Sequence, residues 1–158
     1  MTEHTNHYYY SFEQEGNFSY SAEDIDQLSE YEKYQLSFHP ERPKYLDYLS
    51  LFDSVEECFS SDEFGAWLIQ THRAEITING SSIPLMSIGQ QTGPTSRYNE
   101  MLEMMKDGEK VKHWNHGMPT PASYERAIRA VDAANEEGRM IITFVDTPGA
   151  DPTEESEA

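Results

Sequence analysis

A short polar turn follows an apolar run near the end of the sequence and is the best candidate for chemistry. The run covers residues 140–145, and the turn reads Asp146-Thr147-Pro148-Gly149-Ala150. The run predicts a buried strand that delivers the turn to a site. An aspartate there can hold the Mg²⁺ shell of a GTPase, but that chemistry needs an upstream Gly-x-x-x-x-Gly-Lys-Ser/Thr loop. No glycine here precedes Lys-Ser or Lys-Thr, so a GTPase is disfavoured. A plain tight turn built by Pro148 and Gly149 stays open.

Four histidines raise the question of a metal site: His39, His72, His113 and His116. His113 and His116 are three residues apart, but no third ligand stands at a suitable spacing. We therefore predict solvated or hydrogen-bonded histidines and no metal ligands.

Nucleophilic catalysis finds no support in the sequence. The Gly-x-Ser-x-Gly pattern of a serine nucleophile does not occur. The single cysteine, Cys58, excludes an internal disulfide and a cysteine-based zinc cluster. Its neighbours Glu56 and Glu57 disfavour a thiolate, because nearby negative charge opposes ionisation of a thiol. We predict a packed thiol at Cys58, and no residue is assigned a catalytic role.

Negative charge is concentrated at the two ends of the sequence. The 158 residues carry a net charge of −18, and hydrophobic residues make up 37%. Residues 1–30 hold seven acidic side chains and residues 151–158 hold four, with no Lys or Arg in either segment. An acidic surface repels phosphate groups, which argues against nucleic acid and anionic membranes as partners. Neither a signal peptide nor a transmembrane run is visible, so the expected location is cytoplasmic, or the plastid stroma.

The first part of the chain is predicted to be a tail followed by helices. Residues 1–20 show no helical or strand period, which is typical of a disordered acidic tail. Residues 21–60 are predicted to form a helical N-terminal segment. Ser21 caps a first helix, residues 29–38 form a second, and residues 44–59 form a third on the spacing of their apolar side chains.

A β-hairpin is predicted where the apolar residues begin to alternate, with a period of two residues. Residues 75–78 alternate, Asn79-Gly80 supplies a turn with positive φ angles, and residues 83–88 continue as the second strand. Farther along, residues 98–106 are predicted to form a helix. Its methionine-rich face is suited to a core or a contact surface.

The strongest helix signal lies just before the final apolar run. Thr120 can cap the helix, Pro121 takes the first helical position, and Gly138 ends it in the left-handed conformation. Together with strands 83–88 and 140–145, this helix predicts a βαβ unit with parallel strands and hence the α/β fold class. The helix, residues 122–137, carries an apolar stripe predicted to pack as one face: Tyr124, Ala127, Ile128, Val131 and Ala134.

Four segments between residues 31 and 150 carry a family resemblance. They are Gln35-Leu36-Ser37-Phe38-His39-Pro40-Glu41-Arg42-Pro43 with Leu46-Asp47-Tyr48, Asn79-Gly80 through Gln90-Gln91, Asn115-His116-Gly117-Met118-Pro119-Thr120-Pro121 with Tyr124 and Ala127, and residues 141–150. In these segments the chain resembles the carboxyltransferase α subunit of the multi-subunit acetyl-CoA carboxylase, a member of the crotonase-like superfamily. One segment alone would be a weak sign, but the four occur in the order of the family.

The resemblance implies a fold and a reaction. The fold is a partial crotonase-like spiral of ββα units over residues 61–150, followed by an acidic tail at 151–158. In the family, an α and a β subunit move a carboxyl group from carboxybiotin to acetyl-CoA, which gives malonyl-CoA for fatty acid synthesis. Backbone N–H groups there hold the enolate oxygens. Positions, without catalytic roles, are carried over for a family-like loop and a family-like turn: Gly117, Met118 and Pro119, and Asp146, Thr147, Pro148, Gly149 and Ala150.

The sequence departs from the family pattern at three points. The Gly-rich segment that supplies the oxyanion donors of the α subunit has no counterpart. The His-Gly-Asp-Arg segment expected before the hairpin is replaced by residues 60–65, and the Lys-Gly turn after it by Gln91-Thr92-Gly93-Pro94. We therefore expect a truncated relative that is not catalytic alone and binds no cofactor directly. Its last strand, residues 140–145, is expected to lose its sheet neighbours and to offer an open edge unless the N-terminal helices or a partner cover it.

Three functions stay open on these grounds. The first is association with a carboxyltransferase β or α subunit, or with a second copy of the chain. The second is an enzyme subunit that another chain completes. The third is an acidic interaction module that reuses the fold fragment and docks its tails on a basic partner, with binding that weakens at high salt.

Overall fold

The computed structural model describes residues 26–36, 42–94, 103, 106–153 and 156, which belong to two compact units, residues 1–42 and 43–158. The predicted tail at 1–20, the helix start at Ser21 and most of the predicted helix at 98–106 lie outside the described residues.

In the first unit, helix α2 spans Glu30–Leu36. It begins at a reciprocal cap, because Ser29 N–H donates to the Glu32 carboxylate and Glu32 N–H donates to Ser29 Oγ. The predicted helix at 29–38 is confirmed over these residues.

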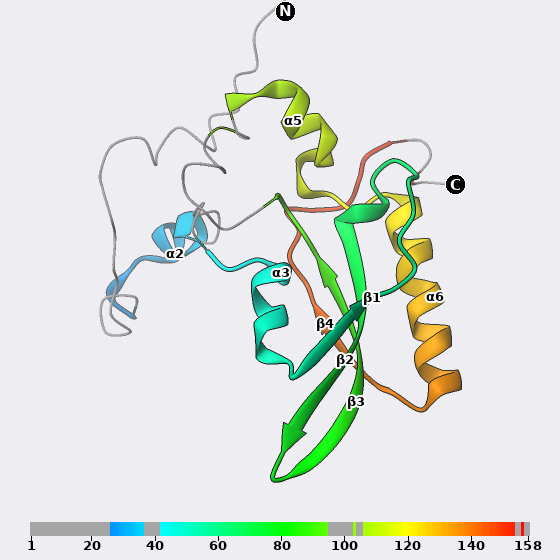
Figure 1. The fold of residues 1–158 in the computed structure, drawn as a ribbon. Coiled ribbons are helices and arrows are strands. Elements are labelled where there is room, and N and C mark those ends of the chain that lie inside the picture. The colour runs from blue at the N-terminus through cyan, green and yellow to red at the C-terminus, as the bar shows by residue number, and fades with distance from the viewer. Residues whose placement is uncertain (1–25, 37–41, 95–102, 104–105, 154–155, 157–158) are drawn as a thin grey trace, which may run out of the picture. The chain divides into compact units, whose positions relative to one another are not determined.

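The second unit is built on a four-stranded sheet with the order β1-β2-β3-β4 (Figure 1). Strands β1, β2 and β3 pair antiparallel, whereas β4 pairs parallel to β3. The strands are β1 (Ser54–Glu57), β2 (Ile69–Ile78), β3 (Ser81–Gln90) and β4 (Met140–Phe144). The helices are α3 (Tyr45–Tyr48), α5 (Gly108–His113) and α6 (Pro121–Glu137), with 3₁₀ turns η2 (Leu49–Leu51), η3 (Ala66–Leu68) and η4 (Asn115–Gly117).

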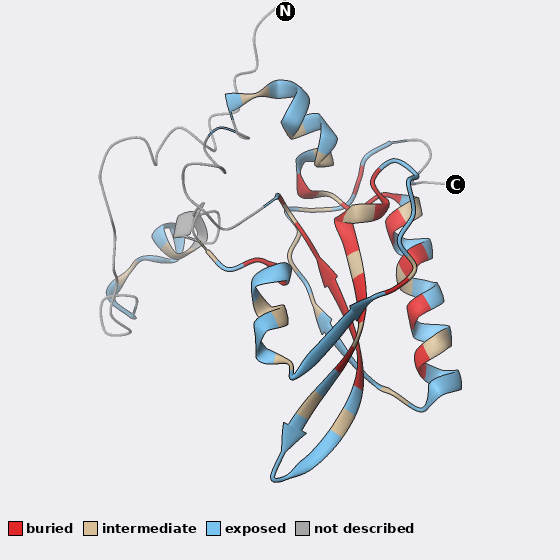
Figure 2. Ribbon diagram, in the orientation of Figure 1, coloured by how far each residue is buried: buried red, intermediate tan, exposed pale blue. Residues whose placement is uncertain are grey.

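Helix α6 covers one face of this sheet and α3 covers the other. On the α6 side, Cys58, Met86 and Ile88 pack with the small residues Ala130 and Ala134, which let the helix approach closely. On the opposite side the ring of Tyr45 fills the space above Gly89, where an added Cβ would lie 1.8 Å from the ring. The two faces of β2 and β3 are therefore both buried near the middle of the sheet (Figure 2).

The hairpin and the βαβ unit match their predictions. Asn79 and Gly80 have φ angles of 51° and 79°, which allow the tight turn between β2 and β3. Gly138 ends α6 with a φ of 65°. Thr120 stands at the N-cap position of α6, but its side chain does not cap; its hydroxyl donates to Phe64 O at 3.3 Å.

The prediction of a helix over residues 44–59 is wrong in its second half. After α3 and η2 the chain forms β1, in which Val55 lies opposite Ala74 of β2. Cys58 N–H continues the pairing by donating to Thr71 O. The apolar spacing that favoured a helix is overridden because β2 offers a free edge to this segment.

The buried face of α6 also differs from the predicted stripe. Its fully buried positions are Ser123, Arg126, Ala130 and Ala134, and only Ala134 belongs to the stripe. The stripe's large side chains are exposed, at 49% for Tyr124, 59% for Ile128 and 43% for Val131. Burial of Arg126 is possible because its guanidinium finds hydrogen-bond acceptors, as described below.

The final strand was predicted to be buried as in a complete spiral, but to offer an open edge where its sheet neighbours are missing, and the structure agrees with the open edge. Strand β4 is an edge strand, and exposure reaches 59% at Met140, 40% at Ile141 and 37% at Ile142 (Figure 2). Only its carboxyl end is covered, where Phe144 stacks on Tyr48 with ring centroids 5.2 Å apart. An apolar run was a sound sign of a strand but not of its burial.

Candidate functional site

The family-like loop and the family-like turn lie in contact at one edge of the sheet. Strands β3 and β4 are parallel, so the chain segments that follow them leave from the same edge. The hydroxyl of Thr147 donates to Gly117 O at 3.1 Å. A Cβ added at Gly117 would lie 3.3 Å from Pro148, and the φ of Gly117 is 81°, so this contact needs glycine in the loop.

The turn is held rigidly by the end of β3. Asp146 N–H donates to Gln90 Oε1 at 2.6 Å. The Asp146 carboxylate accepts a hydrogen bond from the Thr92 hydroxyl at 3.0 Å. Within the turn, Thr147 Oγ1 accepts from Gly149 N–H at 3.3 Å. Sequence reasoning assigned no positioning role to Gln90 or Thr92; the one available signal was two adjacent glutamines directly after an apolar strand.

Gln91 anchors the segment that follows β3. Its side chain is buried, its Oε1 accepts from Leu46 N–H at 3.0 Å, and its Nε2 donates to Gly93 O at 2.5 Å. The segment that replaces the family's Lys-Gly turn is thereby tied to the start of α3.

Two residues other than glycine have positive φ in the loop, directly before Gly117. Asn115 has a φ of 42° and His116 a φ of 53°. Asn115 Nδ2 donates to Met118 O at 2.9 Å, which closes the loop on itself. Met118 is half-buried and Pro119 is buried, so these two members of the loop pack inward.

Arg126 is a buried charged residue of α6. Its Nη2 donates to Glu57 Oε1 at 2.8 Å and to Cys58 O at 3.1 Å, and its Nε donates to Thr71 Oγ1 at 3.2 Å. The side chain is 4% exposed, and a guanidinium in such a place is tolerated because most of its donors are used. Arg126 therefore fixes α6 against β1 and β2.

Cys58 lies in the packed core beside Arg126. The residue is buried, and its Sγ lies 3.7 Å from Thr71 Oγ1 and 3.8 Å from Met86 Sδ. The predicted packed thiol is confirmed.

His72 and His113 lie in different surroundings. His72 is buried and its Nδ1 lies 2.9 Å from the Tyr45 hydroxyl, which also donates to Ser87 Oγ at 3.0 Å. Burial lowers the pKa of His72 and raises the pKa of Tyr45, because it disfavours the charged form of each. His113 is exposed and stacks on Trp67 with ring centroids 4.5 Å apart.

His116 is exposed, and His39 lies outside the described residues. Within the described part of the chain, no group of three His, Cys, Asp or Glu residues is arranged to hold a metal ion.

The hydrogen bonds of the turn decide which of its N–H groups could bind a substrate oxygen. The N–H groups of Asp146 and Gly149 are both engaged, by Gln90 and by Thr147. Oxyanion stabilisation needs N–H groups that point at the reacting oxygen. These two N–H groups therefore hold the turn in shape and are not donors to a substrate in this conformation.

The arrangement defines a class of protein: an α/β chain whose parallel βαβ unit presents a loop and a turn in contact at one sheet edge. The sequence model of the acetyl co-enzyme A carboxylase carboxyltransferase-like family matches residues 14–158. The chain belongs to this family, as the resemblance predicted.

Three relatives show how far the similarity extends, each of them an acetyl-coenzyme A carboxylase carboxyl transferase subunit alpha. The protein of Listeria welshimeri is 37% identical over 128 residues, which cover 79% of this chain and 35% of the relative. That of Chlorobium phaeovibrioides is 36% identical over 136 residues, or 82% and 36% of the two chains. That of Vesicomyosocius okutanii is 36% identical over 130 residues, or 79% and 34%. The chain thus spans about a third of the length of these curated relatives.

One further observation concerns membranes. Among the described residues, no helix is long and apolar enough to cross a bilayer.

Proposed function

We propose that this chain serves carboxyl transfer from carboxybiotin to acetyl-CoA as an α-type carboxyltransferase component. It acts by associating with another carboxyltransferase subunit, and the 158 residues alone do not catalyse the transfer. The observation that carries the proposal is the hydrogen bond from Thr147 to Gly117 O, because it joins two of the four segments in which the chain resembles the family.

Two features support the need for a partner. The N–H groups of Asp146 and Gly149 are engaged within the chain, so the turn offers neither of them to an enolate. Among the strands that the structure describes, β4 leaves one edge of the sheet open and apolar, which is the side on which a crotonase-like spiral would continue. The spiral and the partner are parts of the proposal.

The test measures binding and turnover separately. The full chain is purified with a bacterial carboxyltransferase β subunit, and malonyl-CoA formation from acetyl-CoA and carboxybiotin is followed. The matched control is the intact Listeria welshimeri α subunit with the same β subunit. We expect the chain to bind and turnover to stay at the level of the β subunit alone. Turnover comparable to the control would overturn the non-catalytic part, and no binding to any carboxyltransferase subunit would overturn the association.

The open edge at β4 favours a second candidate, an enzyme subunit completed by another chain. Here the missing catalytic donors come from that chain. Adding the part of the Listeria welshimeri α subunit that follows the 128 residues matched by this chain would then raise malonyl-CoA formation well above the β-subunit background. An unchanged rate, with both polypeptides bound, would exclude this candidate.

A further inference from the structure

A buried cluster of polar side chains joins α3 to the sheet. The Tyr45 hydroxyl lies 2.9 Å from His72 Nδ1 and 3.0 Å from Ser87 Oγ. The exposed fraction is 1% for Tyr45, 6% for His72 and 0% for Ser87. Buried polar groups are tolerated when they are hydrogen-bonded and uncharged. The cluster therefore holds α3 in place as long as its three side chains stay neutral.

Helix α3 covers the ends of β3 and β4 through the same tyrosine. The Tyr45 ring lies over Gly89, near the end of β3, and its centroid is 5.5 Å from that of Phe144, the last residue of β4. Tyr48 stacks on Phe144 as well. The family-like turn and the segment that supports it begin just after Phe144 and Gly89, so the position of α3 bears on the candidate site.

Hydrogen bonds lead from α3 to the turn. Leu46 N–H donates to Gln91 Oε1 at 3.0 Å, which ties α3 to the segment after β3. The neighbouring Gln90 holds the turn, because its Oε1 accepts from Asp146 N–H at 2.6 Å. Loss of α3 from the sheet would break the contacts at Gln91 and at Phe144, and the turn would lose support on both sides.

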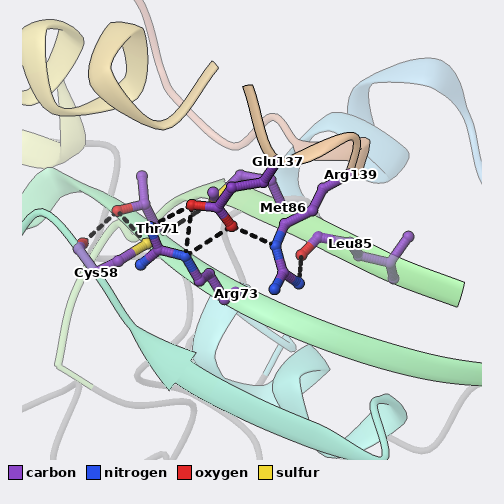
Figure 3. Close-up of polar contacts among 7 residues, drawn as sticks. All are labelled: Cys58, Thr71, Arg73, Leu85, Met86, Glu137 and Arg139. Carbon is purple, nitrogen blue, oxygen red and sulfur yellow. Dashed lines mark hydrogen bonds and ion pairs between the residues drawn. The ribbon is translucent and has the colours of Figure 1, made fainter. Parts of the chain in front are cut away.

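The charged groups near His72 on β1 and α6 already pair with each other. Glu57 of β1 lies opposite His72 in the sheet, and its carboxylate accepts a hydrogen bond from Arg126 of α6 at 2.8 Å. Arg73, the next residue of β2, lies on the other face of the sheet and pairs with Glu137 at the end of α6 (Figure 3). Both carboxylates are used by arginines, so neither is free to neutralise a charge on His72.

The elements on the α3 side add little charge. Strands β3 and β4 contain no charged residue. In α3, the exposed Asp47 accepts a hydrogen bond from Lys44 N–H at 2.8 Å, and the Lys44 residue is itself buried. A proton on His72 would therefore create a buried positive charge. Burial accordingly holds the pKa of His72 below 6.5, with Glu57 raising it and Arg126 lowering it.

We propose that α3 is a pH-sensitive cover of the turn, and that protonation of His72 releases it. In the released state water reaches the imidazolium, the Tyr45 ring leaves Gly89, and the turn loses the support of Gln91 and Phe144. The α6 side of the sheet stays folded, because its core lies on the other face. A group whose pKa is lower in the closed state favours that state at high pH, so the cover is closed at pH 7 and opens as the pH falls below 6.5. This inference goes beyond the proposed function, because it concerns the conformation of the chain alone.

Hydrogen exchange followed by NMR on the full chain tests the cover. Protection factors, corrected for the intrinsic pH dependence of exchange, are measured at pH 7, 6 and 5. Uptake of one proton on opening lowers protection roughly tenfold or more over this range, and we expect that loss at Leu46 N–H and Asp146 N–H. The internal reference is Cys58 N–H, which donates to Thr71 O in the core on the α6 side. Its protection should fall less than about twofold.

Two variants separate His72 from other groups. His72→Gln removes the titration and should give Leu46 and Asp146 the same protection at pH 7 and at pH 5. The matched control is His113→Gln, at an exposed histidine that stacks on Trp67, and it should keep the pH dependence of the wild type. If His72→Gln does not fold, the ¹⁵N chemical shifts of the His72 ring in the wild-type chain decide. They should change over the same pH range as the protection of Leu46.

Three results would overturn the cover. The first is protection at Leu46 and Asp146 that does not change between pH 7 and pH 5. The second is an equal loss at Cys58, which would mean that the whole chain unfolds. The third is a pH dependence that survives in His72→Gln, or a His72 ring that takes up its proton while the Leu46 amide stays protected.

Discussion

The two edges of the sheet are built in opposite ways. Strand β1 is four residues long, carries Glu56 and Glu57, and is fastened to α6 by the buried Arg126. Strand β4 has no charge and exposes Ile141 and Ile142. Short, charged edges resist further pairing, whereas apolar edges invite it. The difference indicates that the β1 edge resists pairing with a further strand, whereas the β4 edge does not.

The largest expected effect concerns the covered end of β4. In Gly89→Ala the new Cβ would lie 1.8 Å from the buried Tyr45 ring, which packs on Phe144. We expect a loss of about 3 kcal/mol of unfolding free energy in urea, because the ring has no room to move. Gly108→Ala, with nothing within 4 Å, is the control and should change it by less than about 1 kcal/mol. Equal effects would show that Tyr45 does not anchor this end of β4.

Substitution of Arg126 removes the hydrogen bonds that hold β1 to α6. Arg126→Met should cost about 2–3 kcal/mol in urea unfolding, because Cys58 O and Thr71 Oγ1 lose a charged donor. Arg129→Met on the same helix removes only an exposed ion pair with Glu125 and should cost less than about 0.5 kcal/mol. If the two variants lose the same stability, Arg126 does not fasten β1.

A smaller effect is expected near β1, where His72 should make the free energy of unfolding depend on pH. Burial holds the pKa of His72 below its usual 6.5, and Arg126 lowers it further while Glu57 opposes both. The unfolded chain therefore binds a proton at His72 more readily than the folded chain does. The contribution of neutral His72 to the free energy of unfolding is thus complete above about pH 6.5 and is lost as the pH falls. Unfolding free energies measured at pH 7, 6 and 5 should fall more steeply for the wild type than for His72→Gln. Parallel curves would contradict this assignment.

The smallest effect on stability is expected at the open edge. Ile142→Lys should change the unfolding free energy by less than about 0.5 kcal/mol, because the side chain is already exposed. It should nevertheless reduce concentration-dependent light scattering, since a charge protects an edge. Val55→Lys, on the edge that is already charged, should change neither quantity. A large loss of stability in Ile142→Lys would mean that β4 is not open as described.

The parts that sequence patterns predicted correctly are those set by local chemistry. Asn79-Gly80 fixes the hairpin because both residues accept a positive φ. Pro121 and Gly138 fix the ends of α6 for similar reasons. The contact between Gly117 and Thr147 was not visible in the sequence, although both segments were singled out, because it depends on the parallel pairing of β3 and β4.

The parts that sequence patterns missed depend on partners far away in the chain. Residues 54–57 had helical spacing, yet they form β1 because β2 offers backbone hydrogen bonds. Arg126 would be expected at the surface, yet it is buried because Glu57, Cys58 O and Thr71 accept its hydrogen bonds. Its burial places Ile128 on an exposed flank.

The sequence by itself determined the family, the hairpin, the ends of α6 and the apolar character of β4, because motifs, turns and caps act over a few residues. Only the tertiary structure decided which apolar residues are covered. Burial depends on the elements that surround a side chain, and it is this that leaves Ile128 of α6 and Ile142 of β4 exposed.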